Sequence, residues 1–422
     1  MTKQEGWETN SLSKVADIVM GQSPDSKYYS EDEIGLPFLQ GCAEFGSRFP
    51  RPILYCSQSK KIAPKDSILF SVRAPVGRLN IAERDYIIGR GLAAISGSSV
   101  DSEYLEHYLQ FEANRFQSVS QGSTFEAINS SELKNWLIEH PEAPSEQGKI
   151  GEILSTVDRV IEQTESLIAK QQRIKAGLMQ DLLTRGIDEQ GNLRSEETHV
   201  FKDSPLGRIP EEWDVNTLNE VTTKIADRDH TTPQYFEDGI LMISPMAFCY
   251  DEGIDFDQCP RITESAHRQN SKKTNCTPGD LILHRIGAGL GQVRIVLDDH
   301  PDYSILHSLA LVRPDYKRIT TAFLKWSLRS FDLQHQMDMG TQSIGVPDLG
   351  LDKIASLKLK LPHYLDEQIR IGSLIDSEQR NVDQLILSAD KLRSLKAALM
   401  QDLLTGKRCV TALLPKPEEA ST

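Results

Sequence analysis

The chain has 422 residues, of which 39% are hydrophobic and 26% charged, and a formal net charge of −14. This composition is that of an ordinary globular protein, and no apolar run approaches the roughly 20 residues that a membrane helix needs. The beginning, MTKQEGWETN, lacks the basic and then apolar layout of a signal peptide, so we expect a cytoplasmic protein with no membrane attachment. The six cysteines contain no C-x2-C pair and predict no metal site or disulfide framework.

Residues 1–143 are expected to form one mixed domain with a sheet core and a few helices. Runs such as ILFSV at 68–72 and YIIG at 86–89 are short and β-branched or apolar, and Gly, Pro, Asn and Ser separate them, as is typical of strands. The segment SEYLEHYLQFEANRFQS at 102–118 is expected to be helical.

A long amphipathic helix is predicted at 144–186, and a linker follows it at 187–212. Apolar residues recur from Ile150 to Leu182 at alternating steps of three and four, which is the pattern of a coiled-coil seam. At about 1.5 Å per residue, some 37 helical residues span roughly 55 Å, too long for the interior of one small domain. We therefore interpret the helix as a spacer between domains. Its apolar face needs a second helix of similar length to cover it.

The rest of the chain repeats this organisation. Residues 213–362 are expected to form a second mixed domain, 363–408 a second long helix and 409–422 a carboxy-terminal tail. The predicted strands of the second domain include LILHRI at 281–286, VRIVL at 293–297 and LALVR at 309–313, and its predicted helix is at 321–337.

The two predicted long helices end in nearly the same ten residues. KAGLMQDLLT at 175–184 returns as KAALMQDLLT at 396–405, and the match extends backward at the same offset to the EQ-x2-I-G near the start of each helix. The domains match more faintly, for example in the spacing W-x4-L-x2-V that begins at Trp7 and at Trp213. The chain is therefore an internal duplication, and each long helix is the natural cover for the other.

This organisation resembles the specificity subunit of type I restriction-modification systems over nearly the whole chain. The segments that carry the resemblance are GQSPDSKYY at 21–29, PFLQG at 37–41, QGSTFEAINSSEL at 121–133, FKDSPLGRIPEEW at 201–213, both EQ-x2-I-G helix starts and both MQDLLT endings. The resemblance implies an α+β fold with two mixed α/β target-recognition domains, separated by two long antiparallel coiled-coil helices and related by a pseudo-two-fold repeat.

The resemblance also implies a function and partners. Each domain would read one half of a bipartite, asymmetric target in double-stranded DNA, while the helices set the spacer and dock two methyltransferase subunits. Restriction and translocase subunits would complete the complex. S-adenosylmethionine, ATP and Mg would be held by those partners, and this subunit would have no catalytic site and no cofactor of its own.

The residues support the expected lack of catalysis. The chain contains no G-x4-G-K-[ST] phosphate loop, no H-E-x2-H and no G-x-S-x-G. IGAGLG at 286–291 could suggest a nucleotide-binding loop, but such a loop should open into a helix. The next residues, QVRIVLDD, are typical of a strand, so we predict a glycine-rich hairpin or bulge.

Charge weighs against strong DNA binding by this chain alone. Residues 1–143 have 14 basic and 19 acidic side chains, and residues 213–362 have 16 and 20. Because affinity depends on the field at the contacting face, local basic surfaces can still suffice, and basic partner subunits would add to them.

The candidate DNA contacts combine suitable side-chain chemistry with a position beside a predicted strand or in a polar loop. Arg can contact guanine and Gln adenine in a bidentate manner, whereas Lys mostly contacts phosphate. The candidates are Lys60, Lys61, Arg73, Arg78, Arg90, Gln121, Ser123, Thr124, Lys272, Lys273, Arg285, Gln292, Arg294, Thr341, Gln342 and Ser343. The alternative for each is an ordinary solvated loop residue or an ion-pair partner.

The repeated helix ends predict partner-docking surfaces. The candidates are Met179, Gln180, Asp181 and Thr184, and their repeats Met400, Gln401, Asp402 and Thr405. An apolar seam does not require the polar members of this set, and a surface that occurs twice can bind one kind of partner twice. Two alternatives stay open: these residues repeat only because the helices pack together, or the chain is a coiled-coil interaction scaffold that has lost DNA reading.

Overall fold

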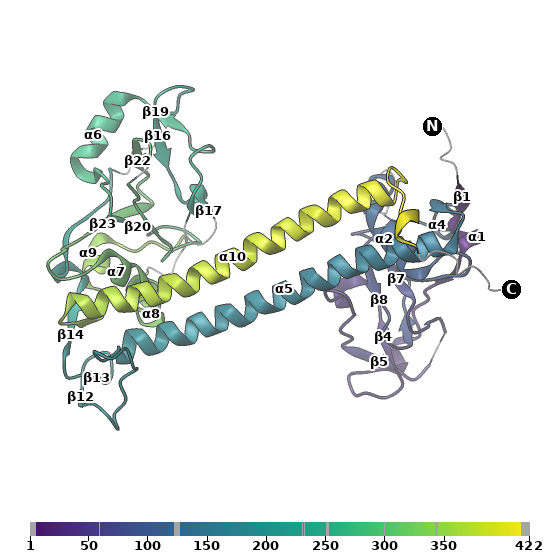
Figure 1. Ribbon diagram of the computed structural model, residues 1–422, viewed down its shortest axis with the longest axis horizontal. Helices are drawn as coiled ribbons and strands as arrows, with labels where there is room; N and C mark the ends of the chain where they lie inside the picture. Colours follow the sequence, from purple (N-terminus) through teal and green to yellow (C-terminus); the bar gives the residue numbers. More distant parts are fainter. Residues whose placement is uncertain are drawn as a thin grey trace. The chain divides into compact units, whose positions relative to one another are not determined.

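The computed structural model describes residues 6–58, 60–121, 127–229, 231, 233–249, 253–298, 300–341 and 345–414. The chain forms two compact units, one of residues 1–166 and 386–422 and the other of residues 167–385. Each unit contains one sheet-rich domain, together with a part of each of two long helices, α5 (Pro144–Arg185) and α10 (Leu365–Leu403) (Figure 1). The predicted α+β class with two mixed domains and paired long helices is confirmed.

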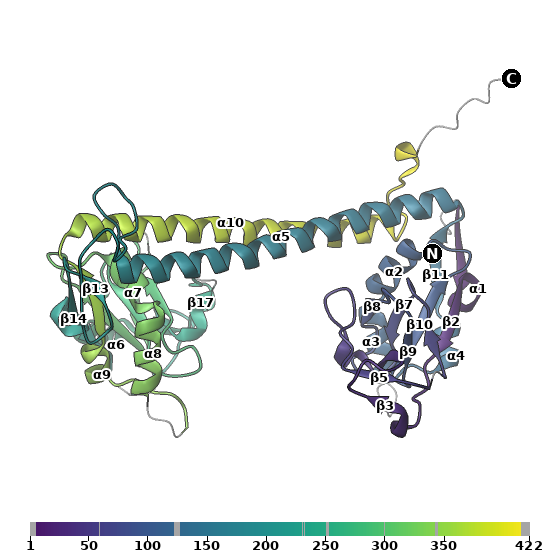
Figure 2. The same cartoon turned by 90° about the horizontal axis from the view of Figure 1, so that it is seen from below.

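The domain of the first unit contains two main sheets. Its elements are β1 (Trp7–Ser11), α1 (Leu12–Val15), β2 (Ala16–Met20), β3 (Tyr29–Ser30), β4 (Leu36–Leu39), β5 (Leu54–Cys56), β6 (Ile62–Ala63), β7 (Ile68–Ser71), β8 (Leu79–Ile81), β9 (Tyr86–Ile88), β10 (Leu92–Gly97), α2 (Ser102–Phe111), α3 (Ala113–Gln121), α4 (Ser130–Lys134) and β11 (Leu137–Pro141). One sheet has the order β2-β10-β7-β8 and the other β3-β5-β4-β9-β6, while β1 pairs with β11. Figure 2 shows α2 and α3 beside the first sheet.

The second unit repeats this topology. Its elements are β12 (Phe201–Lys202), β13 (Ile209–Pro210), β14 (Trp213–Thr217), β15 (Thr222–Ala226), β16 (Ile240–Ile243), β17 (Phe248–Cys249), β18 (Gly253–Ile254), β19 (Arg261–Ile262), α6 (Glu264–Thr274), β20 (Leu281–His284), β21 (Val293–Ile295), β22 (Tyr303–Ile305), β23 (Leu309–Pro314), α7 (Thr321–Leu328), α8 (Phe331–Gly340), α9 (Leu351–Ser356) and β24 (Lys358–Pro362). The order β15-β23-β20-β21 repeats β2-β10-β7-β8, and β14 pairs with β24 as β1 does with β11.

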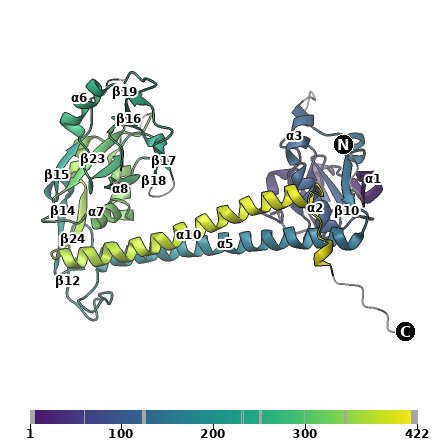
Figure 3. The same cartoon turned by 45° about the horizontal axis from the view of Figure 1, so that its top comes forward.

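The units differ beside the parallel pair of strands that both contain. β16 is parallel to β22 as β4 is parallel to β9. The first unit places strand β6 next to this pair, whereas the second unit has helix α6, which lies near β19 and β16 in Figure 3. The His267 ring on α6 bonds to the Ser304 hydroxyl on β22, 3.0 Å away.

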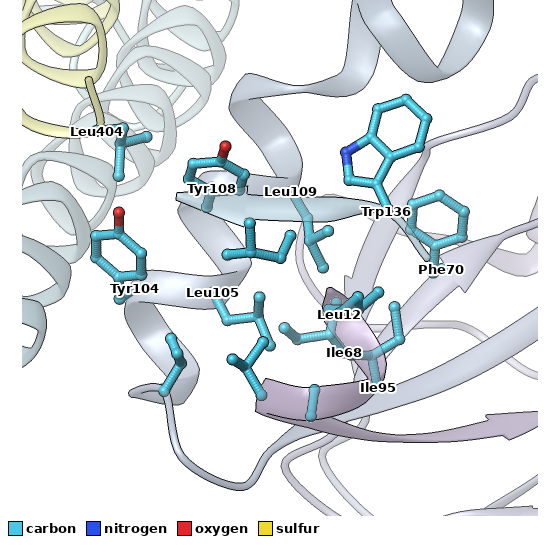
Figure 4. Packing of buried hydrophobic residues seen from close by; sticks show 14 of the residues in the cluster. Leu12, Ile68, Phe70, Ile95, Tyr104, Leu105, Tyr108, Leu109, Trp136 and Leu404 are labelled. Carbon is cyan, nitrogen blue, oxygen red and sulfur yellow. The ribbon is translucent and has the colours of Figure 1, made fainter. Parts of the chain in front are cut away.

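Strand β7 is buried on both faces because each face meets a different layer. Ile68 and Phe70 belong to the cluster that the helices cover, while Leu69 belongs to the cluster under the second sheet. Figure 4 shows Tyr104 and Tyr108 of α2 near Leu404, which follows α10. The end of one long helix is therefore part of the core of the first unit.

The repeated EQ-x2-I-G motif joins each domain to its long helix. Gln147 accepts a hydrogen bond from the Asp101 amide at 2.9 Å and donates to the Pro141 carbonyl at 2.7 Å. Gln368 does the same with the Thr320 amide and the Pro362 carbonyl. Since Asp101 and Thr320 are the N-caps of α2 and α7, the same joint occurs in both units.

The glycine of the motif provides the room for this joint. A Cβ at Gly151 would lie 2.9 Å from the Cβ of Glu103, and one at Gly372 would lie 2.8 Å from the Cβ of Ala322. Only glycine lets α2 and α7 approach the long helices this closely.

Within each unit the long helices meet through polar as well as apolar contacts. In the first unit Asp158 pairs with Lys396 at 2.7 Å and Glu165 with Arg393 at 2.6 Å, an order that makes the helices antiparallel there. The predicted apolar seam is only partly buried, because Leu167 is 52% exposed. Other exposed members are Val160, Ile174, Leu374 and Leu395.

Candidate nucleic-acid interface

Three of the predicted DNA contacts in the first unit line one surface hollow of about 500 Å³. They are Arg73 and Arg78, from the hairpin between β7 and β8, and Arg90, from the loop between β9 and β10. All three side chains are exposed. The residues that complete the lining are Ser23, Gln40, Gly41, Cys42, Ala43, Glu44, Ser71, Ala74, Pro75 and Gly91.

Backbone hydrogen bonds hold the loops of this hollow together. The Ser71 amide donates to the Arg78 carbonyl at 2.9 Å, which closes the hairpin, and the Ser71 hydroxyl donates to the Arg73 carbonyl at 2.7 Å. The Arg90 amide donates to the Ser23 hydroxyl at 3.3 Å. A Cβ at Gly91 would lie 2.9 Å from the Gln40 carbonyl oxygen, so the absence of a side chain allows the loops to converge.

The hollow also contains functional groups that sequence reasoning missed. Gln40 offers both a donor and an acceptor, and the Oε2 atom of Glu44 is buried without a hydrogen-bond partner among the described atoms. Gln40 lies in PFLQG, a segment that carried the family resemblance, so the sequence could have indicated it as a candidate. Nothing in the sequence singled out Glu44, because its place in the hollow depends on a loop far from the arginines.

In the second unit the predicted contacts Arg285 and Arg294 are buried, each only 4% exposed. Arg285 donates to the carbonyls of Leu349 and His307 and to the carboxylate of Asp348, at 2.8 to 3.0 Å. Arg294 donates to the Gly253 carbonyl at 2.9 Å, and its guanidinium lies 4.5 Å from the centre of the Phe248 ring. The prediction that these two arginines contact DNA is therefore wrong, because interior groups of the domain occupy them.

The strand register explains the error at Arg285. The Val72 amide donates to the Gly91 carbonyl, and the Arg285 amide donates to the Ser308 carbonyl at the same place in the second unit. Arg285 thus corresponds to the buried Val72 rather than to Arg73. A shift of one residue along an extended segment moves a side chain to the opposite face.

Gln292 is exposed and corresponds to Arg78. The His284 amide donates to the Gln292 carbonyl at 2.8 Å, as the Ser71 amide does to Arg78. The segment at 286–291 turns between β20 and β21, with Gly287 at φ 115° and Gly291 at φ 89°. The predicted glycine-rich hairpin is confirmed, since a strand and not a helix follows it.

The remaining DNA candidates are scattered. Lys60, Lys61, Lys272 and Lys273 are exposed, and Lys273 forms an ion pair with Asp229. The Thr341 hydroxyl donates to the Asp338 carbonyl at 2.7 Å. The side chain of Gln121 and residues Ser123, Thr124, Gln342 and Ser343 lie outside the described residues.

The pattern of the type I restriction modification DNA specificity domain matches residues 4–172. The second unit repeats the topology of the domain in that match. Over residues 4–172 the chain is similar to type I restriction-modification specificity subunits.

Several known proteins are similar to this chain. A putative type I restriction enzyme MjaX specificity subunit of Methanocaldococcus jannaschii is 38% identical over 185 residues, which are 43% of each chain. The MjaVIII specificity subunit of the same organism is 25% identical over 73% of this chain and 70% of its own. The crystal structure of an S subunit from M. genitalium has a similar fold, with a TM-score of 0.60 at 16% identity over 96% of this chain and 97% of that one.

The described part of the chain lacks two kinds of feature. It contains no group of three or more His, Cys, Asp or Glu residues arranged to hold a metal ion. None of the helices described combines the length and the apolar character that crossing a bilayer requires.

The leucines of the two repeated helix ends are part of the hydrophobic cores. Leu182 and Leu183 are buried in the second unit, and Leu403 and Leu404 in the first. The repetition is thus partly explained by packing, although each end packs into a domain and not only against the other helix.

The threonines and aspartates of these ends form hydrogen bonds or ion pairs with neighbouring groups. The Thr184 and Thr405 hydroxyls donate to the carbonyls four residues earlier. Asp181 forms an ion pair with Arg185, and Asp402 lies 3.3 Å from the Lys407 ammonium.

The groups left to a partner are few. Gln180 and Gln401 are exposed, Met179 is half-buried and Met400 is buried. Beside the first helix end is a hollow of about 210 Å³, which Lys175, Met179 and the 73% exposed Phe331 help to line.

Proposed function

We propose that this chain selects the DNA sequence for a type I restriction-modification complex, and that each unit reads one half of a bipartite, asymmetric target. One observation carries the proposal: the units share a backbone framework but present different side chains at its corresponding positions. Arg78 corresponds to Gln292, as shown above. Arg90 corresponds to His307, because the Leu92 and Leu309 amides close the same turn around them.

The chemistry of the first hollow suits base edges. Arginine binds guanine O6 and N7 through two parallel hydrogen bonds, and a carboxylate such as Glu44 accepts from the amino group of cytosine. Glutamine binds adenine in the same bidentate manner, so Gln292 favours a different base from Arg78. The two units are therefore suited to different half-sites.

Partner subunits complete this function in the proposal. With a net charge of −14, the chain alone has little electrostatic attraction for DNA beyond its local arginines. Two methyltransferase subunits would dock at the repeated helix ends, where Gln180 and Gln401 are exposed. Those subunits and the restriction and translocase subunits would hold S-adenosylmethionine, ATP and Mg.

Methylation mapping of the assembled complex tests the proposal. Arg78→Ala should relax one position of one half-site, and Gln292→Ala one position of the other, each with a loss of about 1–3 kcal/mol of discrimination. Arg159→Ala, an exposed arginine on α5, is the matched control and should change neither. Changes by Arg78→Ala and Gln292→Ala within the same half-site would refute the two-reader model, and so would methylation that ignores both variants.

A further inference from the structure

Another hollow, of about 280 Å³, lies in the second unit beside α6 and is lined in part by a buried arginine. Arg228 follows strand β15 and is 5% exposed. Its Nη2 atom donates to the Thr231 carbonyl at 2.9 Å and lies 3.1 Å from the Thr231 hydroxyl. Its Nε and Nη1 atoms have no hydrogen-bond partner among the described atoms.

Among the described residues, no carboxylate forms an ion pair with this guanidinium. Of the two flanking carboxylates, Asp229 pairs with Lys273 at 2.5 Å, and Asp227 lies 3.4 Å from Arg285. Burial lowers the pKa of Arg228, yet an arginine still carries its positive charge at neutral pH. A buried charge without a partner is costly, and an anion in the hollow would offset that cost.

The walls of the hollow offer hydrogen-bond donors to such an anion. The amides of Gln269 and Asn270 on α6 line it, as do the hydroxyl residues Thr231 and Thr263. Lys272 and Lys273 are exposed on the same helix and add positive charge. Oxygen-rich anions with several acceptors, above all phosphate, match this set of donors.

The first unit lacks this arrangement. Ala226 pairs with Leu311 at the place where Val19 pairs with Ala94, so Arg228 falls at the position of Gly21. A Cβ at Gly21 would lie 2.1 Å from the Gly89 carbonyl oxygen, which leaves no room there for a side chain. The first unit also has strand β6 where the second has α6.

We propose that Arg228 and the hollow beside α6 bind a phosphate group of the DNA backbone, giving the second unit a sequence-independent anchor that the first does not have. The inference rests on the proposed function for the source of the phosphate, but the anion site itself does not depend on it. A backbone contact positions the reader on the duplex without selecting a base.

Inorganic phosphate tests the anion site in the purified full-length chain. Phosphate should raise the melting temperature above that in chloride at equal ionic strength, and Arg228→Gln should abolish this difference. In chloride, Arg228→Gln should melt higher than the wild type, because it removes an unpaired buried charge. Lys353→Gln, at an exposed lysine on α9 of the same unit, is the control and should keep the phosphate effect. An Arg228→Gln chain that melts lower and still responds to phosphate would show a purely structural role.

Duplex DNA and the assembled complex test the source of the phosphate. Arg228→Gln should weaken binding to all sequences by roughly tenfold and lower the salt slope by about one, with the methylated sequence unchanged. Arg228→Lys keeps the charge and serves where the glutamine variant fails to fold; it should retain the phosphate effect.

The outcomes separate the two proposals. Unchanged DNA binding by Arg228→Gln, in a complex that recognises a bipartite target, would overturn this inference and leave the proposed function intact. A chain that phosphate stabilises through Arg228, in a complex that binds no DNA, would overturn both the proposed function and the DNA source. Relaxation of a single base position would replace the phosphate contact by a base contact.

Discussion

Substitution of Gly372 by alanine tests the joint between domain and helix. The new Cβ would lie 2.8 Å from the Ala322 Cβ and 3.4 Å from the Phe323 amide nitrogen, so α7 must shift away from α10. Overpacking of this kind costs about 1–3 kcal/mol. Alanine also favours a helix over glycine by roughly 1 kcal/mol, which would hide part of that cost.

Gly177→Ala provides the control that separates the two effects. Gly177 belongs to α5 in the same unit, and a Cβ there would meet nothing within 4 Å. This variant should therefore show the helix gain alone, and the difference between the two variants measures the overpacking.

Thermal unfolding followed by circular dichroism is the assay. At about 2–4 °C per kcal/mol for a unit of this size, Gly372→Ala should melt about 2–12 °C below Gly177→Ala. If Gly372→Ala melts at the same temperature as Gly177→Ala or above it, the close approach of α7 to α10 is not what the glycine provides.

Arg285→Ala should lower the free energy of unfolding of the second unit by about 2–3 kcal/mol, because two carbonyls and a carboxylate lose a charged donor. Substitution of the exposed Arg78 by alanine should change the free energy of unfolding of the first unit by under about 0.5 kcal/mol. Urea unfolding of the two variants measures both values, and equally small effects would contradict the interior role of Arg285. Burial lowers the pKa of His107 to about 4. As pH falls, His107 therefore binds a proton in the unfolded chain before it does so in the folded one, and the first unit should lose stability between about pH 6.5 and about pH 4. His107→Gln should reduce this loss when the free energy of unfolding is measured against pH. An unchanged pH dependence in the variant would show that His107 is not its cause. Four residues inserted both after Ala169 and after Asp390 add about 6 Å to each helix. They should lengthen the unrecognised DNA between the two half-sites by about one or two base pairs of about 3.4 Å. Methylation maps with an unchanged distance between the half-sites would show that the helices do not set it.

Local patterns in the sequence were enough to predict the α+β class, the two mixed domains and the two long helices. The alternating steps of three and four around Ile150 and Ile371 depend only on neighbours along one helix, and the structure has helices there. The glycine-rich hairpin at 286–291 was predictable for the same reason, because the residues after it are strand formers.

The sequence did not show which of the candidate residues share a site. Arg73 and Arg78 come from one hairpin and Arg90 from another loop, and only strand pairing and the close approach at Gly91 bring them to one hollow with Glu44. Their sequence neighbourhoods differ little from that of Arg285, which is buried.

That difference between Arg73 and Arg285 depends on tertiary structure alone. A strand places successive side chains on opposite faces, so one residue of register decides whether an arginine meets solvent or the interior. The register is set by partners such as Ser308 and Leu349, which lie far along the chain from Arg285. Residue type and local pattern therefore determined the elements of this chain, while long-range pairing decided which of its charged side chains are exposed to solvent.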